Sequence, residues 1–76
     1  MVELEATTSQ IEIVLNGQAR AAPAGCSLRD LLVWLEVDPA RVAVELNRSI
    51  VSRQEWDRVI VEAGAALEVV QFVGGG

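Results

Sequence analysis

The sequence predicts an α+β fold in two layers, with one main helix packed on one face of a mixed sheet of four to five strands. A short alternating segment runs into Asn16-Gly17, the strongest short signal for a β-hairpin. One amphipathic helical pattern follows it, and further strand-like segments come after the helix. At 76 residues the chain has room for a single domain, whose core must be compact and apolar.

The first two strands are expected to form the hairpin. Residues 11–15 alternate apolar with polar closely enough for a strand, and the second strand should run from Gln18 to about Ala22. A strict two-residue turn would set Arg20 opposite Ile13 on the buried face. The sequence therefore leaves the register of this hairpin open.

A helix is expected next. Ser27 is followed three residues later by Asp30, a spacing that resembles a capping box. The leucines that follow lie at i, i+3, i+4 and i+7 and form one apolar stripe for packing on the sheet: Leu28, Leu31, Leu32 and Leu35. Trp34 flanks this stripe and Val33 points away from it. Asp38-Pro39 should end the helix, because the residue before a proline avoids the α region.

The rest of the chain is interpreted as three more strands and one short helical turn. In chain order, these are a strand over 42–46, a turn at 47–49, a short strand at 50–51, a helical turn capped by Ser52 with Glu55, an extended segment at 59–61 and a last strand over 66–70. This order of elements is that of the β-grasp fold. Its first and last strands lie parallel in the middle of the sheet, and both are apolar here, as buried parallel strands should be.

Composition and charge exclude several classes of function. The net charge is −5, and the six basic residues, all arginines, are scattered along the chain. We therefore expect the partner to be a protein with a basic surface and not a nucleic acid. With no histidine and one cysteine, the sequence offers no metal site and no side-chain catalytic triad. The start of the chain lacks the features of a secretory leader, and no apolar run could cross a bilayer. We expect a cytoplasmic protein that binds no membrane and holds no cofactor.

Three parts are predicted: a flexible N-terminal extension at 1–9, the domain at 10–73 and a flexible tail at 74–76. Taken alone, Gly74-Gly75-Gly76 could be an inert end of the chain. Glycines can also pass through a narrow active site in an extended form, and they leave the carboxylate of Gly76 sterically open to react with ATP. A contact surface for partners is expected beside the tail, at Val70, Phe72 and Val73.

Several segments together resemble the ThiS family of ubiquitin-like sulfur carriers in thiamin biosynthesis, within the ThiS/MoaD-like superfamily. The resemblance covers nearly everything from Ile11 onward. It is carried by Leu15-Asn16-Gly17, the VAVELN run at 42–47, the IVSRQEW run at 50–56, Gly64 and the FVGGG end at 72–76. The extension before Gln10 and the apolar Val33-Trp34 depart from the family pattern.

The resemblance implies a carrier that is a cosubstrate and not an enzyme. An E1-like adenylyltransferase of the ThiF type would adenylate Gly76 with Mg-ATP, and a sulfur donor system would then convert it to a thiocarboxylate. Thiazole synthase of the ThiG type would take the sulfur to make thiazole phosphate. We expect the carrier itself to bind no cofactor and to be monomeric when free.

Other functions remain open at this point. One is the MoaD-like small subunit of molybdopterin synthase, although the segment before the glycines in that protein typically contains proline, unlike Gln71-Phe72-Val73. A carrier for tRNA thiolation or a protein modifier is another, and the absence of lysine counts against a modifier that forms chains. A plain β-grasp interaction module with an inert tail belongs to a different class.

Two side chains outside the tail have competing interpretations. Cys26 precedes the helix, where the helix dipole would lower a thiol pKa and suit a redox or sulfur-relay role, but a small structural residue is the favoured interpretation. Trp56 could bind a partner, and its position between strands favours a place in the core. Val33 and Trp34 together could begin an exposed apolar patch.

Overall fold

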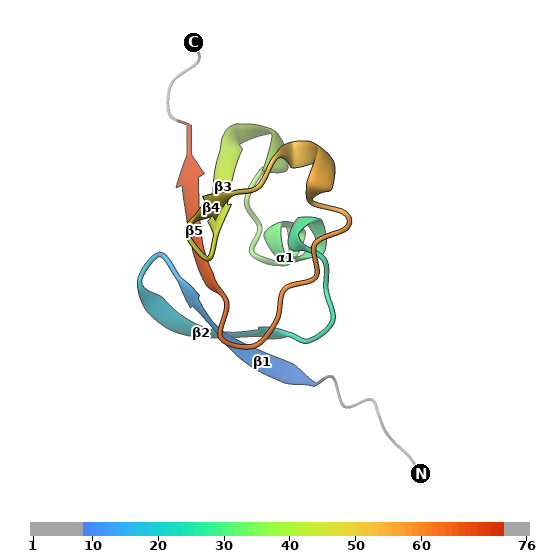
Figure 1. Cartoon of the computed structure of the whole chain (residues 1–76), viewed down its shortest axis with the longest axis vertical. Coiled ribbons are helices and arrows are strands. Elements are labelled where there is room, and N and C mark those ends of the chain that lie inside the picture. The colour runs from blue at the N-terminus through green and yellow to red at the C-terminus, as the bar shows by residue number, and fades with distance from the viewer. Residues whose placement is uncertain (1–8, 73–76) are drawn as a thin grey trace.

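The computed structural model describes residues 9–72 as a five-stranded mixed sheet with one α-helix on one of its faces (Figure 1). Its elements are β1 (Gln10–Leu15), β2 (Gln18–Pro23), α1 (Leu28–Trp34), η1 (Pro39–Arg41), β3 (Val42–Leu46), β4 (Ser49–Ile50), η2 (Arg53–Glu55) and β5 (Ala66–Gln71). The strand order is β2-β1-β5-β3-β4, and β1 runs parallel to β5 in the middle of the sheet. The predicted β-grasp fold is confirmed. The expected extension up to residue 8 and the tail from residue 73 lie outside the described residues.

The hairpin has the tight register that the sequence left open. Asn16 and Gly17 both have positive φ, 50° and 85°, and form a two-residue turn that pairs Ile13 with Arg20. Because β2 is an edge strand, Arg20 can direct its guanidinium outward over the Trp34 ring, 5.5 Å from the centroid. A cation–π contact at the rim of the core thus accommodates a charged residue on the helix side of the sheet.

Helix α1 begins where the sequence predicts and ends earlier. The Ser27 hydroxyl accepts a hydrogen bond from the Asp30 N–H at 3.1 Å, which confirms the cap. The predicted end at Asp38-Pro39 is wrong. The helix stops at Trp34 because Glu36 is left-handed, with φ 64°, and the N–H groups of residues 36 and 37 return to the carbonyls of residues 33 and 32. This is a Schellman motif closed without glycine. Asp38 instead caps the short η1.

The second half follows the predicted order with small shifts. A two-residue turn at Asn47 and Arg48 starts β4 at Ser49, one residue before the expected strand at 50–51. The side chain of Ser52 makes no capping hydrogen bond, contrary to expectation, although η2 forms after it. The segment at 59–61 is held beside the start of α1 by a bridge and two main-chain hydrogen bonds, and is not a full strand.

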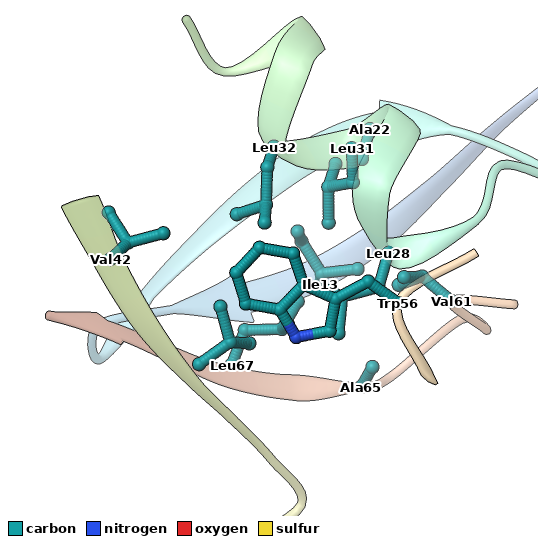
Figure 2. Packing of buried hydrophobic residues seen from close by; sticks show 11 residues of the cluster. Ile13, Ala22, Leu28, Leu31, Leu32, Val42, Trp56, Val61, Ala65 and Leu67 are labelled. Carbon is teal, nitrogen blue, oxygen red and sulfur yellow. The ribbon is translucent and has the colours of Figure 1, made fainter. Parts of the chain in front are cut away.

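The core lies between α1 and the sheet, and Trp56 is its largest member (Figure 2). Only 1% of this residue is exposed, and its indole N–H donates to the carbonyl of Val51 at 3.0 Å. The guanidinium groups of Arg53 and Arg29 lie 5.0 and 5.8 Å from the centroid of the ring. The structure therefore supports the core interpretation of Trp56. All three leucines of the stripe within α1 are fully buried beside it.

Replacing Leu32 by alanine should destabilise the domain by about 2–5 kcal/mol, because the lost side chain leaves a cavity between the helix and the sheet. Its neighbour Val33 is exposed on the same helix, so Val33→Ala is the matched control and should change stability by less than about 0.5 kcal/mol. Urea unfolding of both variants measures the difference. Equal free energies of unfolding would show that the helix faces the sheet with a different side.

Candidate functional site

Strand β5 leads directly to the predicted site. The glycines at 74–76 and Val73 lie outside the described residues, while Val70 and Phe72 are described at the end of β5. The strand is central in the sheet, so its neighbours on both sides fix its direction (Figure 1). The last hydrogen bond on the β3 side runs from the Phe72 N–H to the carbonyl of Arg41 at 2.7 Å. The chain is thereby held as far as Phe72, the last residue that the structure describes.

Two turn asparagines fasten β5 through their side chains. The Asn16 amide accepts from the Val69 N–H at 2.8 Å and donates to its carbonyl at 3.3 Å. The Asn47 side chain accepts from the Ala66 N–H at 3.0 Å, while its main-chain N–H donates to the carbonyl of Ala66 at 2.7 Å. The sequence analysis assigns both residues to turns and to the family motifs, and gives their side chains no role. Their positive φ values, 50° each, place the side chains back over the neighbouring strand.

The face of the sheet opposite α1, called here the open face, carries exposed apolar side chains beside the tail. Val70 is 57% exposed and Phe72 53%, and the alternation of the strand places both on this face. Ile50 of β4 is 79% exposed and lines the same hollow as Val70, a shallow depression of about 310 Å³. The structure thus brings Val70 and Phe72 together as expected and adds Ile50. The pairing of Ile50 with Glu45 across the β3–β4 turn sets this direction, and the sequence gives no local signal for that pairing.

An acidic pair lies in the same hollow. Glu45 of β3 and Glu68 of β5 are direct partners across the two strands, and both line the depression. Carboxylates in directly opposite positions repel each other and lower sheet stability. Neither is in an ion pair among the described residues, where the pairs are Arg29–Asp57 and Arg41–Asp38. The open face therefore combines an apolar surface with uncompensated negative charge, which suits a basic, partly apolar protein surface.

Cys26 has the surroundings of a structural residue. Burial raises the pKa of its thiol above the ordinary value, and the negative charge of Asp30 acts in the same direction. The Sγ–H donates to the carbonyl of Pro23 at 3.3 Å. Since a reactive cysteine needs an accessible thiolate, this position does not support the sulfur-relay interpretation.

Residues 9–72 show no group of three or more histidine, cysteine, aspartate or glutamate side chains that could hold a metal ion. Over the same residues, no helix is both long and apolar enough to span a membrane.

Val33 and Trp34, which the sequence marks as a possible apolar patch, do not join the open face. Trp34 is partly covered by Arg20, and Val33 is exposed beside it on α1. Val33 and Trp34 belong to α1, whereas Val70 and Phe72 lie on the face of the sheet opposite that helix. The expected patch therefore consists of one exposed valine and one tryptophan that packs against a guanidinium.

Comparison with known proteins agrees with the residues that carry the resemblance. The model of the ThiS family matches residues 13–76. The sulfur carrier protein ThiS of Escherichia coli is 33% identical over 66 residues, covering 87% of this chain and 100% of that protein. A thiazole synthase of Magnetococcus marinus is 42% identical over 66 residues, but the chain spans only 20% of its length.

Solved structures agree as well. The crystal structure of the thiamine biosynthesis protein ThiS from Geobacter metallireducens superimposes with a TM-score of 0.76 and 30% sequence identity, over 87% of this chain and 100% of that one. The fold, the central motifs and the match through the terminal glycines all converge. This chain belongs to the ThiS family of ubiquitin-like sulfur carriers.

Proposed function

We propose that this chain carries sulfur for thiamin biosynthesis on the carboxylate of Gly76. The observation that carries the proposal is the extent of the family match, which reaches residue 76 and so includes all three glycines. The exposed apolar residues at the end of β5 support it, because enzymes that process a tail must also hold the domain beside it. The chain acts in this scheme as a cosubstrate, and catalysis belongs to its partners.

The proposed cycle has three steps. In an E1-like adenylyltransferase, the Gly76 carboxylate attacks the α-phosphate of Mg-ATP, and pyrophosphate leaves. A sulfur donor then displaces AMP from the acyl-adenylate and leaves a thiocarboxylate. The thiocarboxylate sulfur, which is at the sulfide oxidation level, is finally transferred to the substrate held by a thiazole synthase. An oxygen atom from that substrate or from water takes its place, which regenerates the carboxylate. ATP is abundant in the cytoplasm, which is the location we propose for this cycle.

The matched relatives favour thiamin over molybdopterin as the destination of the sulfur. Two of them are named thiazole synthases and share 42% and 41% identity with this chain over 66 residues. A segment like this chain thus forms about a fifth of those polypeptides. Linking a carrier to the enzyme that consumes its sulfur raises the effective concentration of one for the other.

Intact mass tests the proposal. After incubation with Mg-ATP, the E1-like enzyme and a sulfur source, the mass should rise by the replacement of one oxygen by sulfur. Omission of ATP is the control and should leave the mass unchanged. An unchanged mass in the complete reaction, with an E1-like enzyme shown to be active on another carrier, would favour the inert interaction module.

The acidic pair gives a prediction in which stability and function change in opposite directions. Glu68→Lys places a positive charge opposite Glu45, so it should stabilise the domain by about 0.2–1 kcal/mol. The same change should slow association with a basic partner at low salt, and do so less at high salt. Thermal unfolding and stopped-flow association with the E1-like enzyme measure the two effects.

Glu36→Lys is the matched control, because Glu36 is exposed at the end of α1, away from the open face. It makes the same change in net charge. If both variants slowed association equally, the effect would come from net charge and not from the open face. If Glu68→Lys left the low-salt rate unchanged, acidic steering through this hollow would be wrong.

A further inference from the structure

The pairing of β5 with β1 ends at Leu67, four residues before β5 itself ends at Gln71. On the β3 side, the hydrogen bonds from Asn47 to Ala66 and from Phe72 to Arg41 show that even-numbered residues of β5 bond toward β3. The main-chain N–H and C=O of Gln71 must therefore point the other way. On that side the ladder with β1 runs through Leu67, and beyond it the chain turns away into β2.

The Asn16 side chain extends this ladder by one step and no further. Its side-chain amide hydrogen-bonds to both the N–H and the C=O of Val69, as the main chain of a neighbouring strand would. The next pair of groups that faces this side belongs to Gln71, and within residues 9–72 neither has a hydrogen-bond partner. An exposed edge of this kind can pair with an added strand.

A hollow of about 180 Å³ lies beside this edge on the helix side of the sheet. Leu15, Leu35, Val37 and Val69 supply apolar walls, and Arg20 lies at its rim. Side chains of a strand alternate between the two faces, so every second residue of an added strand would point to this side. The hollow can then receive an apolar side chain.

Arg20 adds a charge preference. Its guanidinium stacks on Trp34, and among residues 9–72 it has no carboxylate partner, unlike Arg29 and Arg41. An acidic side chain two positions from the apolar one would therefore meet an unpaired cation. These features describe the occupant: an extended segment with an apolar and an acidic residue on one face.

We propose that such a segment of thiazole synthase adds as a strand to β5 beside Gln71 when the carrier delivers its sulfur. This inference rests on the proposed function, and the partner is chosen because the thiazole synthases above contain a segment like this chain. The added strand has a mechanical consequence. Five residues reach at most about 17 Å when fully extended, so pairing at Gln71 would limit how deeply the terminal carbon can enter the active site.

Amide exchange gives the direct test, using the full chain and a separately expressed thiazole synthase from the same organism. In the free carrier the Gln71 amide should exchange much faster than those of Val70 and Phe72, which face β3. In the complex its exchange should slow by at least about tenfold. A complex that forms while Gln71 stays unprotected would overturn the inference and leave the proposed function intact. If the E1-like enzyme protected the Gln71 amide from exchange and thiazole synthase did not, the choice of partner would be wrong.

Substitutions provide a second test. Gln71→Pro removes the outward N–H without breaking a bond to β3, and it should weaken binding to thiazole synthase by about tenfold. Gln71→Ala keeps the N–H and should bind within about twofold of the unmodified chain. Both variants should unfold at the same temperature. Equal binding by the two variants would refute strand addition.

The charge preference is tested in the same way. Arg20→Glu should weaken the complex by about tenfold or more. Arg58→Glu makes the same charge change at an exposed site after η2 and should have little effect. Thiocarboxylate formation by the E1-like enzyme, measured on every variant, separates failure of this contact from failure of the proposed function.

Discussion

A chain with one residue added after Gly76 should lose adenylation and sulfur transfer while its unfolding midpoint stays nearly unchanged. The extra residue moves the carboxylate by about 3.3–3.6 Å, and effective molarity falls steeply once the reacting atoms leave near-attack geometry. Deletion of Gly75-Gly76 should have the same effect by withdrawing the carboxylate. Stability should stay unchanged while activity is lost, because every buried core residue of the described part of the chain lies between Ile13 and Leu67.

Pyrophosphate exchange with the E1-like enzyme measures adenylation, and intact mass measures thiocarboxylate formation. A residue added before Met1 is the matched control, since it lengthens the chain equally at the other end, and it should remain fully active. If the chain extended at Gly76 supported either step, the carboxylate would not be the working group. The inert β-grasp module would then be the better description.

The order of elements was predictable because each one depends on local chemistry. Asn16-Gly17 forms the two-residue turn, and the spacing of Leu28, Leu31 and Leu32 decides which side of α1 is buried. The parallel pairing of β1 with β5 follows from the β-grasp order and from the apolar character of both strands. Here local preference and tertiary structure agree, so the sequence alone suffices.

The end of α1 was not predictable in this way. The proline at 39 limits how far a helix can extend, but the Schellman motif at Glu36 ends it earlier. That motif requires a left-handed residue, for which glycine is the usual signal, and Glu36 gives none. The buried position of Leu32 and the half-buried Val37 show why the chain turns there: the turn returns the chain to the core.

The candidate site was predictable only in part. The alternation of β5 places Val70 and Phe72 on one face, but the contribution of Ile50 depends on how β4 folds back on β3. The pairing of Glu45 with Glu68 likewise depends on register between strands more than twenty residues apart in the chain. Contacts of this kind carry no local signal, because side chains meet across strands and not along them.

The second large effect should come from Trp56. Truncation to alanine should cost about 3–5 kcal/mol, since the indole is 1% exposed and fills the space between α1 and the sheet (Figure 2). The change also leaves the carbonyl of Val51 without its donor at 3.0 Å. A small domain has about 5–15 kcal/mol of stability in total, so Trp56→Ala should lose a large part of it and unfold at a clearly lower urea concentration.

Trp34→Ala is the natural control, because the same residue type is 44% exposed there and stacks mainly on Arg20. It should cost no more than about 1 kcal/mol. Far-ultraviolet circular dichroism in urea is the suitable measurement, since it does not depend on tryptophan fluorescence. Trp56→Phe should fall between the two, because it keeps most of the ring volume and loses the N–H donor.

The Trp56 variants also test whether this side chain serves the core or binds a partner. At a temperature where Trp56→Phe remains folded, it should form thiocarboxylate at the rate of the unmodified chain, because its ring is buried away from the open face. A partner-binding tryptophan would give the opposite pattern, with near-normal stability and slow transfer. That result for Trp56→Phe would contradict the core role, and the same result for Trp34→Ala would place a partner on the helix side instead.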